Sequence, residues 1–407
     1  MYGALLLMLY SLYFPYRMQT AKNSPSSAIL PSYTLRNHIP LAAPATREPT
    51  DGSEPFLRVS LGFTPRWYRS RLGIDFSEPW HHDPVYRYET LLQMKELLHD
   101  LFPKVPYFTP RYIDQPYRVI KIEPTCATIS GVNGIMTLPA IYGIPVVYSA
   151  DGWPDAKPGV HIPKEELAKL SSFNLDQNPV VQDIFRQMDT IEQTWGMIHG
   201  YLNYQGILNI ALKVRGNEIF LDLFDDPPFV KKFFRHIALT IEALSKQVQA
   251  RQRETGFHVN LLSMSNCVMN MVSPEQYEEF VLPLDLYLST QYERFGIHTC
   301  NWDATPYLEQ LRKIQRMGYL DTGIMADLAR IKSMFPETRR AVLYSPVQLE
   351  NNSEAQILAD LKRIANEYAP CDVVMADVED TTLDSRVRWF LEAVEKTESR
   401  YSPNKSV

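Results

Sequence analysis

The segment Phe295-Gly296-Ile297-His298-Thr299-Cys300 is typical of a buried β-strand that ends in polar residues. Similar strand-like runs occupy residues 258–265, 320–325, 340–345 and 372–377, and amphipathic helical patterns lie between them. Parallel strands need a crossover connection, which is usually a helix. The regular alternation of strands and helices therefore predicts an α/β fold with a parallel sheet.

Local start signals support the helices between these strands. Ser273-Pro274-Glu275-Gln276 has an N-cap serine, a proline at the first helical position and a glutamine placed for a capping box. Ser353-Glu354-Ala355-Gln356 repeats the box, and Thr305-Pro306 and Thr382 are the expected starts of two more helices. A further strand is expected at residues 56–63, where the folded part of the chain begins.

Residues suited to a functional site gather where the predicted strands end, at Ser265-Asn266-Cys267, at His298 to Asn301, and at Asp377 with Glu379. No glycine-rich phosphate loop of the G-x-G-x-x-G or Walker type follows any strand, which argues against a nucleotide-binding Rossmann fold. Functional residues at the carboxyl ends of several strands are typical of a closed barrel. We therefore expect a (β/α)8 TIM barrel with an N-terminal extension and inserted loops.

The composition is that of a globular protein and excludes a disordered or fibrous chain. Of 407 residues, 45% are apolar and 22% are charged, which is close to the average for soluble domains. A net charge of −6 without a long basic block argues against nucleic-acid and anionic-membrane partners. The four cysteines are widely spaced, which favours reduced thiols in a cytoplasmic protein over a disulfide scaffold.

The two ends of the chain are expected to add little to the core. Residues 1–54 are predicted to be a flexible leader, since Ser, Pro, Thr and Ala dominate from Met18 onward. The apolar start at residues 1–14 resembles the core of a signal peptide but lacks a basic flank and an adjacent cleavage site. Because of this resemblance, export is the alternative to a cytoplasmic location. The barrel is expected at residues 55–398, followed by a flexible tail at residues 399–407.

The strongest chemical signal is the pair His298 and Cys300. Residues two apart on a strand point to the same side, so both side chains are expected to project together from the strand end. An imidazole nitrogen and a thiolate in that arrangement are suitable zinc ligands. The alternative is a polar strand end with an incidental thiol, because a cysteine is often only a small buried hydrophobe.

A catalytic zinc usually has three protein ligands and one open position. Cys371 begins a predicted strand, so we expect it at the opposite rim from His298 and Cys300. Asp377 and Glu379 follow the end of that strand and are better placed. We therefore predict Asp377 as the third ligand, with a solvated acidic loop as the alternative.

Two other groups receive less weight as metal ligands. Cys267 follows the predicted strand at 258–265 and is interpreted as a packed loop cysteine rather than as part of a pocket. His81-His82-Asp83 is an unfavourable metal motif, because adjacent residues rarely converge on one ion.

The stretch from Met271 to Pro283, followed by His298-Thr299-Cys300-Asn301 and Thr305-Pro306-Tyr307-Leu308, resembles the uroporphyrinogen decarboxylase superfamily. Within it, the chain is most similar to the corrinoid-dependent methyltransferases of the methylcobamide:coenzyme M type. The resemblance extends from Pro55 to Val394.

This resemblance implies a barrel with its site at the carboxyl rim. In the methyltransferase branch, a zinc held by His-x-Cys and a later cysteine activates a thiol, whose thiolate takes a methyl group from a methyl-corrinoid. His298 and Cys300 match the first two ligands, whereas Ala376 or Asp377 stands where the later cysteine is expected.

From the resemblance we expect zinc and a corrinoid (cobalamin) as cofactors. The expected partners are a corrinoid protein or free methylcobamide and a small-molecule methyl acceptor or donor, with no nucleic acid and no membrane. The expected metal ligands are His298, Cys300 and Asp377. Asn301 and Glu379 are the expected catalytic residues, and Ser265 and Asn266 are the expected cofactor-binding residues.

Two alternatives remain open at this point. A tetrapyrrole decarboxylase is the first, although the arginine-rich signature that binds acidic tetrapyrroles in that enzyme does not follow residues 56–63. The second is a non-catalytic barrel that binds a corrinoid or another small molecule, since a fold does not guarantee a function.

Overall fold

The structure is a computed structural model that describes residues 56–103, 111–114, 119–122, 127–171, 174–259 and 261–402. All of these belong to the second of two units into which the chain divides, Tyr33–Val407. The predicted leader and residues 403–407 of the predicted tail lie outside the described residues.

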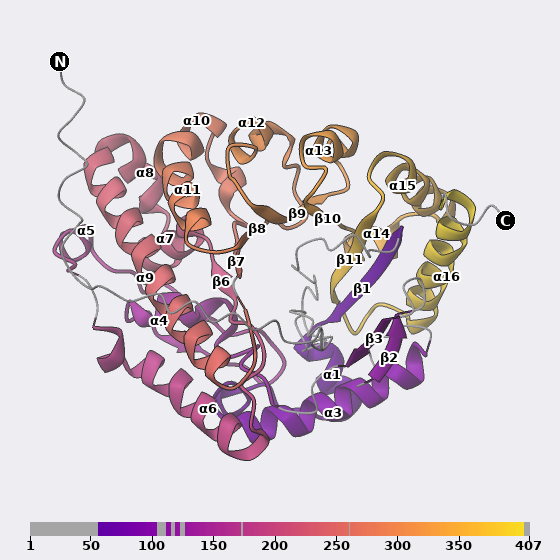
Figure 1. Cartoon of the computed structure of the whole chain (residues 1–407), viewed down its shortest axis with the longest axis horizontal. Coiled ribbons are helices and arrows are strands. Elements are labelled where there is room, and N and C mark those ends of the chain that lie inside the picture. Colours follow the sequence, from indigo (N-terminus) through magenta and orange to yellow (C-terminus); the bar gives the residue numbers. More distant parts are fainter. Residues whose placement is uncertain are drawn as a thin grey trace, which may run out of the picture. The chain divides into compact units, whose positions relative to one another are not determined.

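The main sheet consists of seven parallel strands in the order β1-β11-β10-β9-β8-β7-β6. Their bounds are β1 Leu57–Phe63, β6 Tyr204–Gln205, β7 Leu261–Ser265, β8 Arg294–His298, β9 Met317–Gly323, β10 Arg339–Leu343 and β11 Cys371–Val378. Figure 1 shows these strands following an arc, with helices on its outer side. Because the strands are parallel, their carboxyl ends and the loops that follow them lie at one rim.

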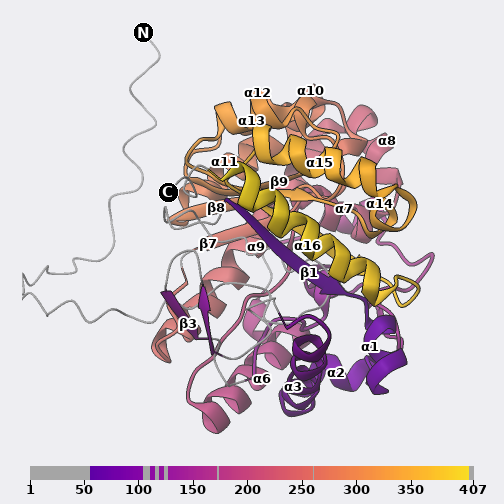
Figure 2. The same ribbon diagram turned by 90° about the vertical axis from the view of Figure 1, so that its right-hand side faces the viewer.

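Helices connect the strands and cover the outer face of the sheet. Their bounds are α1 Pro65–Leu72, α2 Glu78–His82, α3 Pro84–Leu101, α4 Thr137–Ile141, α5 Lys164–Leu167, α6 Pro179–Trp195, α7 Ile207–Arg215, α8 Glu218–Asp225, α9 Pro227–Glu254, α10 Pro274–Gln276, α11 Leu282–Thr290, α12 Leu308–Leu311, α13 Leu328–Met334, α14 Pro346–Asn351, α15 Glu354–Glu367 and α16 Asp384–Tyr401. In Figure 2, α16 runs alongside β1, with which it is in contact. Among the described helices, none is both long enough and apolar enough to cross a membrane.

Among the described residues, two short antiparallel strand pairs lie outside the main sheet. They pair β2 Arg111–Asp114 with β3 Val119–Ile122, and β4 Val146–Val147 with β5 Asp155–Ala156. A π-helical turn at Tyr277–Val281 separates α10 from α11.

An isolated parallel bridge pairs Thr128 with His199, which lies just ahead of β6 in the chain. In the part of the chain that the structure describes, no ladder joins the Thr128 segment to β1. The predicted α/β class with a parallel sheet is confirmed, and the arrangement is compatible with a TIM-like fold.

The predicted strands correspond closely to β1 and to β7 through β11. One difference affects the site. β8 ends at His298, and Cys300 follows it with a left-handed backbone at φ 64° instead of continuing the strand. Hydrophobic alternation located the strand, but it does not reveal where a chain leaves the sheet.

The predicted helix starts are also close to those observed. Ser273 and Gln276 form the predicted capping box, whereas at Ser353 only the serine half of the box is present. The segment at Thr305 begins with a single 3-10 turn, and α16 begins at Asp384, just after Thr382. α16 continues to Tyr401, past the expected barrel boundary at residue 398.

The apolar core lies mainly between the sheet and its covering helices. A separate small cluster consists of Tyr319, Ala341, Leu343 and Val374, with Cys300 packed against it. These four residues come from the adjacent strands β9, β10 and β11, so the cluster packs directly beneath one of the predicted zinc ligands.

Candidate metal centre

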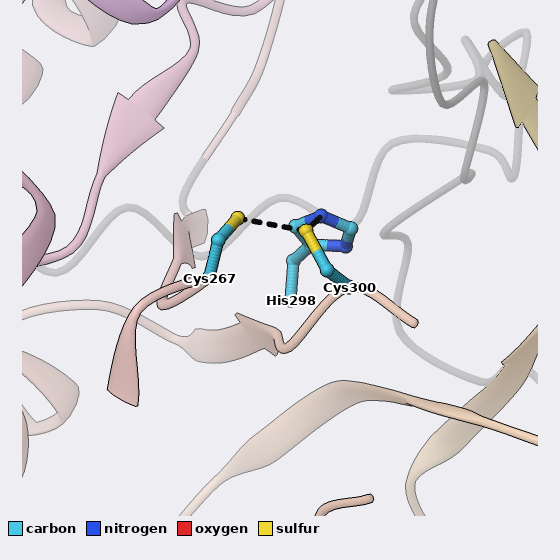
Figure 3. Close-up of side chains that lie close together, drawn as sticks. All are labelled: Cys267, His298 and Cys300. Carbon is cyan, nitrogen blue, oxygen red and sulfur yellow. Dashed lines mark hydrogen bonds between the residues drawn. The ribbon is translucent and has the colours of Figure 1, made fainter. Parts of the chain in front are cut away.

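Three potential metal ligands meet at the carboxyl ends of β7 and β8. They are Cys267, His298 and Cys300, and one ligand atom from each lies within 4.8 Å of the other two. The two sulfur atoms are 2.9 Å apart, and the Cys300 Sγ is 3.0 Å from His298 Nε2. Figure 3 shows the three side chains turned toward one another.

The strand register explains why the two cysteines meet. β7 and β8 pair in parallel with Ser265 opposite His298, and the Asn266 amide donates to the His298 carbonyl at 2.7 Å. Cys267 and Cys300 therefore each lie two residues beyond a paired position. Their loops leave neighbouring strands at the same rim, which brings residues 33 positions apart in the sequence into contact.

Asp321 on β9 orients the imidazole of His298. The carboxylate Oδ2 is 2.5 Å from His298 Nδ1 and also accepts the Tyr319 hydroxyl at 2.8 Å. Oδ1 accepts the backbone N–H of Thr299 at 2.6 Å. Both Asp321 and His298 are buried, with 0% and 6% of their surface exposed. A carboxylate beside Nδ1 favours a proton there, which leaves the Nε2 lone pair facing the cysteines.

The donor set fits zinc. One imidazole nitrogen and two cysteine sulfurs are ligands that zinc prefers, and three protein ligands leave a fourth position for a water or a substrate. A histidine ligand held by a carboxylate is the usual arrangement around zinc in proteins. Cys267 and Cys300 are only partly buried, whereas His298 is buried.

Asp377, the predicted third ligand, is not a member of this close group. It lies in β11 with a left-handed backbone at φ 57°. The Asp377 side chain is exposed at the surface. Its pKa is nevertheless raised to about 6, mainly because surrounding protein atoms desolvate the carboxylate and secondly because Glu379 carries a negative charge. His298 and Cys267 also act electrostatically on its carboxyl group, so Asp377 belongs to the surroundings of the site.

The remaining cysteine and histidine candidates lie elsewhere. Cys371 is paired with Leu57 where β11 begins, and burial raises the pKa of its thiol far above the usual value. His82 bonds to Asp183 and Tyr148, and His81 Nδ1 is 3.0 Å from the Gly131 carbonyl. These contacts are ordinary tertiary hydrogen bonds, in keeping with the low weight that the sequence assigns to this motif.

The other predicted site residues have their own contacts: Ser265, Asn266 and Asn301 lie next to the cluster in the sequence, and Glu379 follows β11. Ser265 Oγ donates to Asn203 Oδ1 at 3.3 Å, and Asn266 donates through its amide to the buried Asp285 at 3.4 Å. Asn301 is exposed, and its backbone carbonyl packs against Gly323. Glu379 accepts the Thr64 hydroxyl at 3.1 Å.

Sequence reasoning missed two residues of the centre. The interpretation of Cys267 as a packed loop cysteine overlooked its contact with Cys300. Asp321 was not singled out, although a carboxylate in the middle of a buried strand is a usable signal, because such a charge needs a partner.

No protein-family model and no curated protein matches this sequence. Among solved structures, a methyltransferase from Methanosarcina mazei is similar in fold, with a TM-score of 0.59 over 90% of this chain and 99% of the other. The two sequences share 13% identity, so the likeness extends to the fold alone.

Proposed function

We propose that this chain is a zinc-dependent methyltransferase with a (β/α)8 barrel. In this proposal it moves a methyl group between a methyl-corrinoid and a thiol or a related acceptor. The observation that carries the proposal is the convergence of Cys267, His298 and Cys300, with Asp321 behind the histidine. The name of the similar Methanosarcina mazei structure, a methyltransferase, agrees with it.

The barrel is the natural completion of the observed sheet. Seven parallel strands follow an arc, and the bridge between Thr128 and His199 adds an eighth position beside β6. Eight parallel strands close into a barrel when each is followed by a covering helix. The site at the carboxyl ends of β7 and β8 then lies at the functional rim of that barrel.

Cys267 supplies the third ligand that the family pattern lacks in this chain. The corresponding position near Ala376 and Asp377 holds no cysteine, but Cys267 presents its sulfur from the loop after β7 instead. The absence of a cysteine there favours a non-catalytic barrel, whereas Cys267 as third ligand supports a catalytic site.

Each residue has a distinct part in the proposed reaction. Cys267, Cys300 and the Nε2 of His298 would hold the metal, and Asp321 keeps that nitrogen unprotonated. Zinc, when bound, stabilises an acceptor thiol as its thiolate near neutral pH. A bound methyl-corrinoid would supply the methyl group, and the acceptor thiolate would be the nucleophile that takes it.

The residues around the cluster complete the proposal. We propose that Ser265 and Asn266 contact the corrinoid and that Asn301 and Glu379 act on the methyl acceptor. Asp377 is proposed as an additional carboxylate beside the metal, since His298 and Cys267 act on it electrostatically. A corrinoid protein or free methylcobamide is the proposed partner. A reducing compartment such as the cytoplasm suits a site with two thiols.

Metal analysis of the purified full-length protein tests this function. We expect about one zinc per chain, as one three-ligand site requires. Cys267→Ala, His298→Ala and Cys300→Ala should each lose it. Cys371→Ala is the matched control and should retain zinc, because this thiol lies at the amino end of β11, whereas the centre lies at the carboxyl ends of the strands. Methyl transfer from methylcobalamin to a small thiol should follow zinc content.

A folded wild-type protein that binds no zinc when the metal is supplied would contradict the proposal. Turnover of a carboxylated tetrapyrrole without metal would instead support the decarboxylase alternative.

A further inference from the structure

We propose that Cys267 and Cys300 form a reversible disulfide, which makes the candidate metal centre a redox switch. The oxidant is a small-molecule disulfide of the glutathione type. Formation of the bond itself depends only on the two thiols, whereas its effect on activity rests on the proposed function.

The distance between the two sulfurs carries the proposal. They are 2.9 Å apart, whereas a disulfide bond is about 2.05 Å long, so closure needs less than about 1 Å of movement. Both cysteines lie in the loops that follow β7 and β8, each two residues after the paired residues Ser265 and His298. Rotations of two short side chains in these loops can supply the movement while the strand pairing stays intact.

Exposure makes this pair more accessible than the third described cysteine. Cys267 and Cys300 are both partly exposed, whereas Cys371 is buried where β11 begins. Burial also raises the pKa of Cys371 well above its usual range. Because the thiolate is the reactive form, Cys371 should stay reduced under conditions that oxidise the pair.

The reaction balances without any further reactant. One cysteine thiolate attacks the small-molecule disulfide, forms a mixed disulfide and releases one small thiolate. The second cysteine sulfur then attacks the protein sulfur of that bond and releases the other small thiolate. Each protein sulfur loses one electron, and the two protons finally reside on two small thiols. His298 Nε2, 3.0 Å from the Cys300 Sγ, is placed to accept a thiol proton on the way.

The consequence for the centre follows from its donor set. A disulfide removes the two thiolate ligands at once and leaves His298 as the one remaining member of the close group. Bound zinc engages the same two sulfurs, so it should slow their oxidation. Oxidation and metal binding therefore exclude each other, and reduction should restore the site.

The test compares two samples of the full-length protein, one loaded with zinc and one treated with a chelator. Both are incubated in a mixture of oxidised and reduced glutathione. After alkylation of remaining thiols, non-reduced peptides are mapped by mass spectrometry. We expect a linked Cys267–Cys300 peptide pair in the chelated protein, at least tenfold less of it in the zinc-loaded protein, and complete reversal by dithiothreitol. Cys371→Ala, the matched control, should form the same link.

Absence of this link from the chelated wild type, or a lasting glutathione adduct in its place, overturns the proposal. This outcome differs from failure of the proposed function. A protein that forms the link but binds no zinc keeps the redox pair and loses the methyltransferase proposal. A protein that binds zinc and is active, but forms no link after chelation, keeps the methyltransferase proposal and loses the redox pair.

Discussion

Asp321 is the residue that orients the His298 imidazole in the candidate metal centre. Its carboxylate contacts His298 Nδ1, the Thr299 amide and the Tyr319 hydroxyl, so it is held from three sides. A fixed carboxylate determines which imidazole nitrogen carries the proton. His298 can therefore present a lone pair to a metal without first losing a proton from Nε2.

Replacing Asp321 with Asn should weaken zinc binding by about 10–100-fold, the usual effect of losing a carboxylate behind a histidine ligand. The amide oxygen can still accept from the Thr299 N–H, and the amide NH2 group can donate to the Tyr319 hydroxyl oxygen, so the fold should persist. Competition with a chromogenic chelator measures the affinity. Asp100→Asn, an exposed position on α3, is the control and should leave it unchanged. Equal affinities in wild type and Asp321→Asn would refute this role.

The elements around Cys267 are held by a buried polar contact between a loop and a helix. Asp285 on α11 accepts the Tyr277 hydroxyl at 2.7 Å and the Asn266 amide at 3.4 Å, both at Oδ2. Its other oxygen has no partner among the described residues. Tyr277 begins the π-helical turn. The turn and α11 therefore help to position the loop that carries Cys267.

Asp285 predicts a dependence of stability on pH. Burial raises the pKa of this carboxyl from 3.8 to about 7, although the hydrogen bonds from Tyr277 and Asn266 oppose the shift. Between these values the folded state holds a proton that the unfolded state has released. The free energy of unfolding should therefore fall as pH rises through this window, by up to the order of 4 kcal/mol, and level off above it.

Urea unfolding of zinc-free protein between pH 5 and pH 8, a range that includes the folded-state pKa of about 7, measures this dependence. Asp285→Asn is uncharged throughout and should show a flatter profile. Parallel profiles for wild type and variant would contradict a protonated Asp285 in the folded state.

Close packing of α7 against the Cys267 loop gives a second prediction at this scale. A Cβ on Gly206, the N-cap of α7, would lie 1.7 Å from Asn266 Oδ1. Gly206→Ala must therefore displace Asn266, which adjoins Cys267. We expect a loss of about 1–3 kcal/mol of stability, measured by urea unfolding, together with weaker zinc binding. Gly152→Ala, which meets only the exposed Ser149 hydroxyl, should have little effect on either.

At the scale of the whole molecule, a buried ion network joins three strands at the end of the sheet opposite the centre. Asp372 on β11 accepts from Arg58 on β1 at 2.9 Å and from Arg339 on β10 at 2.8 and 3.0 Å. All three residues are buried and lie at the amino ends of their strands. This network links β1 to the rest of the sheet.

Asp372→Asn should destabilise the protein by about 3–5 kcal/mol, because it removes the buried negative charge that both Arg58 and Arg339 contact. Thermal or urea unfolding measures the loss. Glu309→Gln, which breaks exposed pairs with Arg312 and Arg330, should cost less than about 1 kcal/mol. Zinc affinity of folded Asp372→Asn protein should match the wild type, since the centre lies at the other end of the strands. A change in affinity without unfolding would contradict this separation.

The sequence by itself determined strands β1 and β7 to β11, the α/β class and the pairing of His298 with Cys300. These depend on local patterns, namely apolar runs, capping residues and short spacings. The two residues were expected to meet because they project from the same strand. Instead, β8 ends at His298, and Cys300 reaches it through a left-handed turn.

Only the tertiary structure decided the rest of the centre. Cys267 joined the group and Asp377 did not, and Asp321 came to lie behind His298. These three outcomes depend on which strands are neighbours, on their register, and on how the loops turn at the rim. Such relations are set by packing between segments far apart in the chain, and no local pattern of residues records them.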